Sequence, residues 1–313
     1  MKNSPLLIFF LAAALILSAC SGSRSLTPAA SLPAPQVLVS SEAPDASPTS
    51  PTDTTPSAAE TPAAPTAQTQ KPLMLPAPEN RTHYQLNLIL NYYTQYAVVD
   101  ETITYTNRSS QPFSELTVVV PPKYYPGSFS LRSLTDSSGS PISGWQEDGV
   151  RFTIPLQTPL TPGESTSLNF SYQLNLPKKE GTFGVSGRQT NLMNWYPYIP
   201  PYEEGTGWII HPQQVENNMV VGEHMVTEMA DFDVSLQLTD RQELIEVAAS
   251  APAEEKNGVR HYHLELARGF SFSVSDSYFE HEIIQDGVRI HSYVFMEARE
   301  AGKAVTEIAA QAL

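Results

Sequence analysis

The side chains best suited to metal chemistry are seven histidines scattered along a chain of 313 residues. None of them begins the His-Glu-x-x-His pattern, which places two imidazoles on one helix face around zinc, beside a glutamate that acts as general base. His224 and Glu228 have helical spacing, but their segment leads into a predicted strand. His261 and His263 share one face of another predicted strand without a third ligand, which favours an exposed hairpin face. We therefore predict no metal site and no cofactor in this chain.

The sequence also lacks the other common catalytic patterns. The segment 184–187 (GVSG) is one residue short of a Gly-x-Ser-x-Gly nucleophile turn, and no glycine-rich phosphate-binding loop occurs. The carboxylate pairs Glu203-Glu204 and Glu254-Glu255 lie in predicted polar loops, where solvation explains them. We therefore predict no catalytic residue. The formal net charge of −15 argues against nucleic acid as a partner.

The single cysteine is placed for lipid attachment. Lys2 supplies a positive charge, residues 6–17 form an almost unbroken apolar run, and Ser18 and Ala19 lead into Cys20. The run is shorter than the about 20 apolar residues of a membrane-spanning helix, and it ends at a processing signal. The tetrad 17–20 (LSAC) resembles the lipobox of bacterial lipoproteins, whose cysteine thiol receives a diacylglyceryl group before cleavage.

This resemblance implies a signal peptide over residues 1–19 and lipid on Cys20. The product would then be held to a membrane in the cell envelope, outside the cytoplasm, with the membrane itself as a partner. Two or three acyl chains hold firmly where one would not, because each buried methylene contributes about 0.8 kcal/mol. An ordinary secretory peptide with a chance cysteine is the alternative.

Residues 20–78 have the composition of a disordered tether. The stretch after Cys20 consists largely of Pro, Ala, Ser and Thr, contains no aromatic residue and holds twelve of the 27 prolines. Such a segment buries too little surface to offset the entropy of ordering its backbone. We expect it to lift the following domain away from the membrane.

Residues 79–296 have the pattern of an antiparallel β domain. Tyr84, Leu86, Leu88 and Leu90 alternate with polar residues, which is the period of a half-buried strand. Further strands are expected, in two sets, at 97–106, 115–120, 129–134, 150–154 and 167–174, then at 232–238, 245–249, 260–266, 270–275, 278–284 and 288–295. Turn residues separate them, including Asp286-Gly287, and no helix intervenes. The fold class predicted is all-β, a large antiparallel sandwich or saddle.

The last segment, 297–313, changes period and is predicted to be a helix. Its apolar residues recur at roughly helical spacing, and they are Ala298, Ala301, Val305, Ile308, Ala309 and Ala312. We expect this stripe to be exposed, or only partly covered by the second set of strands. The sequence stops in mid-helix without a capping residue, as a truncated chain would.

An irregular stretch between the two sets of strands, residues 177–222, is dense in aromatic residues and prolines. Its rings suit a ligand-contacting loop, because flat rings bind at low entropy cost. The alternative is that the rings cover the edge between two sheets. The candidates are Trp195, Tyr196, Tyr198, Tyr202 and Trp208.

The order of features from Tyr84 onward resembles the N-terminal β domain of the alanyl aminopeptidase (aminopeptidase N) family of gluzincin zinc metallopeptidases. The family patterns are an I-x-x-x-N strand, a P-G-E-S turn, an aromatic-Pro motif, a Y-D-V strand and an A-R-D-F segment, here with Gly269 in place of the Asp. The matching segments are Val98–Asn107, Leu160–Ser165, Trp195–Pro197, Asp231–Val234 and Ala267–Phe270.

The resemblance implies a non-catalytic domain that walls one side of a substrate cleft and supports a zinc domain. Zinc would then belong only to a C-terminal domain missing here, whose first helix is residues 297–313, and the chain would be a fragment or inactive. The family's G-x-M-E-N motif is also absent, and Arg188 and Gln189 stand where the family often has a Glu that grips the substrate amine. A zinc-peptidase domain or a peptide substrate are the partners implied. Two alternatives stay open, a surface lipoprotein that binds peptide or glycan through the Trp195–Trp208 loop, and a structural surface lipoprotein.

Overall fold

The computed structural model describes residues 80–213, 215–216, 219–220, 225–240 and 242–313. The predicted signal peptide, Cys20, the predicted tether and His224 lie outside these residues. All described residues belong to one compact unit of the chain. No helix within the described residues has the length and apolar character needed to cross a membrane.

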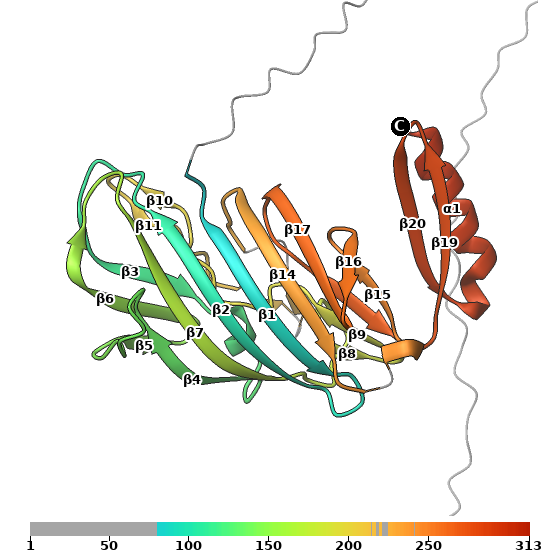
Figure 1. Cartoon of the computed structure of the whole chain (residues 1–313), viewed down its shortest axis with the longest axis horizontal. Helices are drawn as coiled ribbons and strands as arrows, with labels where there is room; N and C mark the ends of the chain where they lie inside the picture. Colours follow the sequence, from blue (N-terminus) through green and yellow to red (C-terminus); the bar gives the residue numbers. More distant parts are fainter. Residues whose placement is uncertain (1–79, 214, 217–218, 221–224, 241) are drawn as a thin grey trace, which may run out of the picture. The chain divides into compact units, whose positions relative to one another are not determined.

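Most strands of the described residues belong to three sheets, which confirms the all-β prediction. The largest has seven strands, in the spatial order β16 (Ala253–Lys256), β17 (Val259–Ala267), β14 (Ala230–Leu238), β1 (His83–Asn91), β2 (Tyr96–Thr106), β7 (Ser165–Asn175) and β4 (Phe129–Thr135). The others are β3 (Phe113–Val119), β6 (Arg151–Leu160) and β5 (Gln146–Asp148), and β15 (Glu246–Ala249), β18 (Phe272–Ser275), β9 (Gln189–Leu192) and β8 (Phe183–Ser186). Figure 1 shows the strands of the large sheet side by side.

Several shorter elements accompany these sheets. Two-stranded pairs join β10 (Tyr202–Glu203) to β11 (Gly207–Trp208) and β12 (Val215–Glu216) to β13 (Met219–Val220). The short 3₁₀ helices are η1 (Pro121–Tyr124), η2 (Gln242–Leu244) and η3 (Met296–Ala298).

Strands from both predicted sets meet in the large sheet. Neighbouring strands are antiparallel except for β1 and β14, which pair in parallel with His83 opposite Asp231 and Leu90 opposite Leu238. A parallel pair needs a long connection, and here almost 140 residues separate the two strands in sequence. Members of the two sets therefore share one continuous sheet, while the remaining strands of each set lie in other sheets.

One face of the large sheet forms the core and the other is polar. On β1 the predicted residues Tyr84, Leu86, Leu88 and Leu90 are all buried, and the residues between them face outward. Buried side chains of all three sheets form one hydrophobic cluster. The alternation therefore fixes which side chains are available for chemistry on the outer face.

A hairpin and a helix end the chain. β19 (Tyr278–Gln285) and β20 (Val288–Phe295) are joined by Asp286 and Gly287, both with positive φ, as the predicted tight turn requires. Helix α1 (Arg299–Gln311) packs on this hairpin (Figure 1) through Gly302 and Thr306, which are buried. A Cβ at Gly302 would lie 2.8 Å from the Val294 side chain, so only glycine permits this approach.

The predicted apolar stripe of α1 points mainly into solvent. Val305 and Ile308 are 61% and 65% exposed, and Ala301 and Ala312 are exposed too, while Ala298 and Ala309 are half-buried. The helix therefore buries a face of small residues and leaves its larger apolar residues uncovered. This agrees with the expectation that the stripe is at most partly covered.

Candidate functional site

The outer face of the large sheet brings titratable side chains from three strands together. His83 lies on β1, Asp233 on β14 and His263 on β17, and the register sets Asp233 directly opposite His263. Alternation directs all three away from the core. His83 is 150 residues and His263 is 30 residues from Asp233 in sequence, so the pairing of the strands brings the three side chains together.

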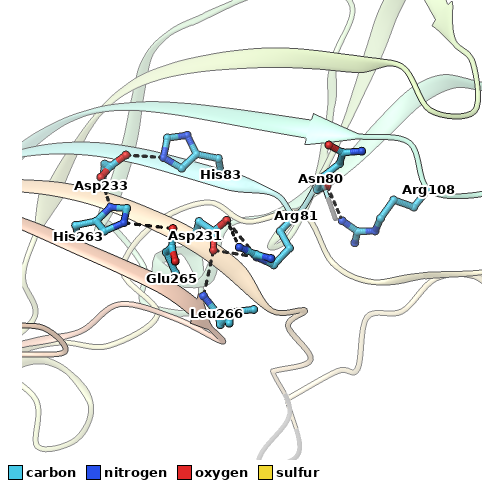
Figure 2. Close-up of polar contacts among 9 residues, drawn as sticks. All are labelled: Asn80, Arg81, His83, Arg108, Asp231, Asp233, His263, Glu265 and Leu266. Atoms are coloured by element: carbon cyan, nitrogen blue, oxygen red, sulfur yellow. Dashed lines mark hydrogen bonds and ion pairs between the residues drawn. The ribbon is translucent and has the colours of Figure 1, made fainter. Parts of the chain in front are cut away.

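In this network, shown in Figure 2, one carboxylate contacts two imidazoles. Asp233 Oδ2 lies 2.7 Å from His83 Nε2, and Oδ1 lies 2.7 Å from His263 Nδ1. The other ring nitrogen of His263 is 3.6 Å from Glu265 Oε1. Partial burial pushes the pKa of Asp233 upward, but hydrogen bonds from His263 and His83 outweigh it and leave that pKa below its usual value. The hydrogen bond to Asp233 and its charge raise the pKa of His263.

A second ion pair fixes the edge of this network. Arg81 donates to both carboxylate oxygens of Asp231, at 2.9 and 3.1 Å from Nε, and Asp231 also accepts the backbone N–H of Leu266. Leu266 has a positive φ of 56°, next to a shift in register between β14 and β17. Asp231 therefore holds an irregular backbone segment in place, which is a structural role.

A groove of about 530 Å³ lies beside the network. It is lined by Gln85, Asn87, Asp233, Val234, Ser235, Pro252, Ala253, Glu254, His261, Tyr262 and His263. Ser235 faces His261 across the β14–β17 pair, yet its hydroxyl donates to Asn87 Oδ1 at 2.8 Å. A serine committed to an amide oxygen is not activated by an imidazole. The groove offers hydrogen bonds and negative charge to a polar ligand.

The aromatic loop is mainly part of the core. Trp195, Tyr196 and Tyr198 are buried, and Trp195 is fully so. Its indole N–H donates to the Phe270 carbonyl oxygen at 3.0 Å, and the Tyr196 hydroxyl accepts the Phe270 backbone N–H at 3.2 Å. This burial corresponds to the alternative in which the rings cover the sheets.

The remaining two candidates of that loop are less enclosed. Tyr202 and Trp208 are half-buried and pack edge-on or tilted against Phe113, at 4.7 and 5.2 Å between ring centroids. Ligand contact by these five rings stays a prediction, with Tyr202 and Trp208 the most accessible.

The segments that carry the family resemblance contact one another in pairs. Asn107, at the end of the first matching strand, is fully buried and donates from its amide to the Leu160 carbonyl at 2.8 Å. Its backbone N–H and C=O bond to Glu164 and Gly163 of the Pro-Gly-Glu turn. Trp195 and Tyr196 bond in the same way to Phe270 of the last matching segment. These motif residues therefore join segments of this domain that are distant in sequence.

Arg188 and Gln189 contact the final hairpin. Arg188 forms an ion pair with Glu297, and its guanidinium carbon lies 3.9 Å from the centre of the Phe295 ring. Gln189 Oε1 accepts a hydrogen bond from the Tyr278 hydroxyl at 3.2 Å. Neither side chain offers the carboxylate that would bind a substrate amine.

The described residues do not fit a peptidase zinc site, because no helix carries the two histidines and the glutamate that such a site needs. Sequence reasoning considered His261 and His263, which do not belong to any close group of three ligands among the described residues. It overlooked Glu280, Glu282 and His291, whose ligand atoms lie within 4.8 Å of one another. Alternation of Glu280 and Glu282 before a predicted hairpin, with His291 after it, was the available signal.

No protein-family model and no curated protein matches the sequence. Solved structures that resemble it include a mutant of the M1 zinc metallopeptidase from Deinococcus radiodurans bound to a Tyr-Ser-Ala substrate, a further structure of that mutant, and the metallopeptidase itself. Identities are 15%, 15% and 14%, with TM-scores of 0.42, 0.43 and 0.40. Each match covers 68% of this chain and 46% of the other, so this chain spans less than half of their length. A likeness at this level assigns no activity.

Proposed function

We propose that this chain is the lipid-anchored, non-catalytic β domain of an aminopeptidase-like zinc metallopeptidase in the cell envelope. In this role it contributes a wall and a support to a zinc-peptidase domain, and it holds that domain to a membrane through lipid on Cys20. Its own residues bind no catalytic zinc and cleave no peptide.

The contacts among motif residues support this proposal. Backbone hydrogen bonds join Asn107 to Gly163 and Glu164 of the turn, and the Asn107 side chain also donates to the Leu160 carbonyl. The Trp195 indole N–H donates to the Phe270 carbonyl. A chance match of short motifs would not be expected to place their members in direct hydrogen-bonded pairs far apart in sequence. The resemblance therefore concerns residues that position the strands of this domain.

The exposed apolar stripe of α1 is the observation that supports a partner domain. Val305 and Ile308 lie in solvent although the opposite face of the same helix is packed. Burying a valine or isoleucine side chain contributes about 1.5–3 kcal/mol, so a partner that covers both gains several kcal/mol. The family resemblance makes a zinc-peptidase domain the partner that we propose for this face.

Crosslinking in the native host tests the proposal. Ile308 is replaced by p-benzoylphenylalanine, and irradiated cells are analysed by mass spectrometry for peptides joined to α1. Lys303 is the matched control, because it is exposed on a different side of the same helix. We expect crosslinks from position 308 to a polypeptide segment that carries His-Glu-x-x-His, in the same or a separate chain. Crosslinks only to proteins without that motif, or equal yield from position 303, would contradict the proposal.

A binding module is the second candidate, and the groove beside His263 is the observation that favours it. Its amides, hydroxyl and carboxylates suit a polar ligand such as a glycan or a cationic peptide. Titration with a tetralysine peptide and with an N-acetylglucosamine tetramer, followed by the amide signals of Ser235 and His261, would distinguish them. Unchanged signals with both probes would remove this candidate.

A further inference from the structure

Two rows of polar side chains cross the outer face of the large sheet. The registers of neighbouring strand pairs coincide, so each strand from β17 to β4 contributes one residue to each row. The first row, in the spatial order of the strands, is His261, Ser235, Asn87, Asp100, Ser171 and Ser133. The second row lies two residues away along each strand and is His263, Asp233, Gln85, Thr102, Asn169 and Thr135. Every member of both rows is polar, and alternation directs all of them away from the core.

A polar outer face is ordinary for an antiparallel sheet, but this one is hollowed along the two rows. The groove beside His263, of about 530 Å³, is lined by the members of both rows on β17, β14 and β1. A second hollow, of about 200 Å³, is lined by the members on β2, β7 and β4. Asn87 of β1 lines both, so the two hollows meet there and form one trough across six strands. At about 4.8 Å between neighbouring strands, the trough is about 24 Å long.

Side chains in the trough retain hydrogen-bonding capacity for a ligand. The Ser235 hydroxyl donates to Asn87 Oδ1 at 2.8 Å. This bond orients the Asn87 amide, whose N–H groups have no acceptor among the described residues. Within the part of the chain that the structure describes, the side chains of Gln85, Asp100 and Ser171 make no hydrogen bond. The trough therefore offers donors and acceptors on both sides of β1.

The chemistry of the trough favours an uncharged polymer that is rich in hydroxyl groups. A hydroxyl group both donates and accepts a hydrogen bond, so it can pair with the amides, hydroxyls and carboxylates of both rows. Both Asp233 oxygens already contact imidazoles, His83 Nε2 and His263 Nδ1 at 2.7 Å, which leaves little of its charge for a cation. The exposed carboxylate of Asp100 repels an anionic polymer. A bound peptide would gain from pairing at a sheet edge or from apolar pockets, and the rows supply neither.

We propose that the trough binds a linear, uncharged glycan that lies across the strands of the large sheet. This proposal deepens the binding role considered above for the groove, and it rests on that second candidate function. Neither row contains an aromatic side chain, so each sugar is held by hydrogen bonds without stacking on a ring. Binding strength should therefore come from the number of sugars that reach both hollows at once.

Titration calorimetry of the full chain in detergent tests the trough with a hexamer and a dimer of N-acetylglucosamine as probes. We expect the hexamer to bind at least about tenfold more tightly, because only the longer probe reaches both hollows. Gln85→Ala in the groove and Asp100→Ala in the second hollow should each weaken hexamer binding by about three- to tenfold. Gln237→Ala is the matched control, an exposed outer-face glutamine of β14 that lines neither hollow, and it should bind as the unmodified chain does.

Each other outcome overturns the proposal. Equal affinities for dimer and hexamer, or weaker binding in only one of Gln85→Ala and Asp100→Ala, would confine the ligand to one hollow and refute the continuous trough alone. A hexamer that does not bind, or that binds Gln237→Ala as weakly as the other variants, would exclude a specific glycan site. Hexalysine that binds more tightly than the hexamer would indicate a cationic peptide instead. Thermal unfolding shows whether each variant is folded, and these results do not depend on which domain covers α1.

Discussion

Glu101 is a carboxylic acid in the middle of the hydrophobic core, and its protonation should control the pH dependence of stability. Its side chain is 2% exposed and lies between Leu86 and Phe170 on the inward face of the large sheet. Tyr172 donates a hydrogen bond to Oε2 at 3.1 Å, whereas Oε1 is buried and has no hydrogen-bond partner among the described residues. Desolvation therefore raises the pKa of Glu101 well above its usual value, and the hydrogen bond from Tyr172 offsets only part of this effect.

The direction of the pH effect follows from the raised pKa. The folded chain keeps the proton on Glu101 at pH values where the unfolded chain has lost it. The associated stability is complete below the ordinary glutamic acid pKa and decreases as pH rises toward the folded-state pKa. The slope in that window is about 1.4 kcal/mol per pH unit for one proton.

Glu101→Gln should remove this slope. Glutamine has nearly the same shape and can accept the Tyr172 hydrogen bond through its carbonyl oxygen. Its buried N–H donors lack partners, which costs about 1–3 kcal/mol at low pH, where the acid is neutral in both states. As pH rises the unmodified chain loses stability and the variant does not, so the variant gains about 1.4 kcal/mol per pH unit on it.

Urea unfolding from about pH 4 to about pH 8 measures the effect. Asp100→Asn is the control, because Asp100 immediately precedes Glu101 in β2 and points to the exposed face. The difference in unfolding free energy between Glu101→Gln and the unmodified chain should grow with pH, and that for Asp100→Asn should change little. Parallel curves for all three proteins would refute the reasoning, since Glu101 would then titrate alike in the folded and unfolded states.

Four further predictions follow from single features of the chain. Replacing Cys20 with Ser should release the protein from membranes into the soluble exported fraction, and a variant that still pellets in high salt would disprove lipid anchoring. Asn107→Ala should lower the free energy of unfolding by about 1–3 kcal/mol, because it leaves a buried carbonyl group unpaired; urea titration measures it, and no loss would contradict the role given to this corner. Limited proteolysis should cut near Glu297 before the β core, because α1 is short and its outer face is uncovered; equal resistance would show that α1 is stably packed. NMR titration should give His263 a pKa above that of an ordinary histidine, and Asp233→Asn should bring it back; no change would exclude the contact.

The strands could be predicted from the sequence because each one reports its own burial. The alternation of apolar and polar residues from Tyr84 to Leu90 shows which side chains face the core, and it can be read within this one strand. The turn at Asp286-Gly287 and the helix after it carry local signals of the same kind. Pairing between strands carries no such signal, so the parallel alignment of β1 with β14 was not evident from the pattern.

The candidate site depended on that hidden pairing. His83 and Asp233 come together only because β14 crosses to the side of β1, and their separation of 150 residues gives no hint of contact. His261 and His263 were recognisable as neighbours on one strand, but their partners on β14 and β16 were not. A site whose side chains come from several strands is therefore poorly predicted when the sequence pattern of each strand is considered separately.

Helix α1 shows how far periodicity alone can be taken. The 3.6-residue period identifies an apolar stripe containing Val305 and Ile308, and a core would normally cover such a stripe. The packed face is instead the one with Gly302, because Val294 approaches the helix too closely for any larger side chain. The short distance between the helix and the hairpin admits only small residues at this contact, so residue size rather than hydrophobicity determines which face of α1 is packed. The uncovered stripe then represents surface for a second contact, which is the physical basis for proposing a partner domain at this helix.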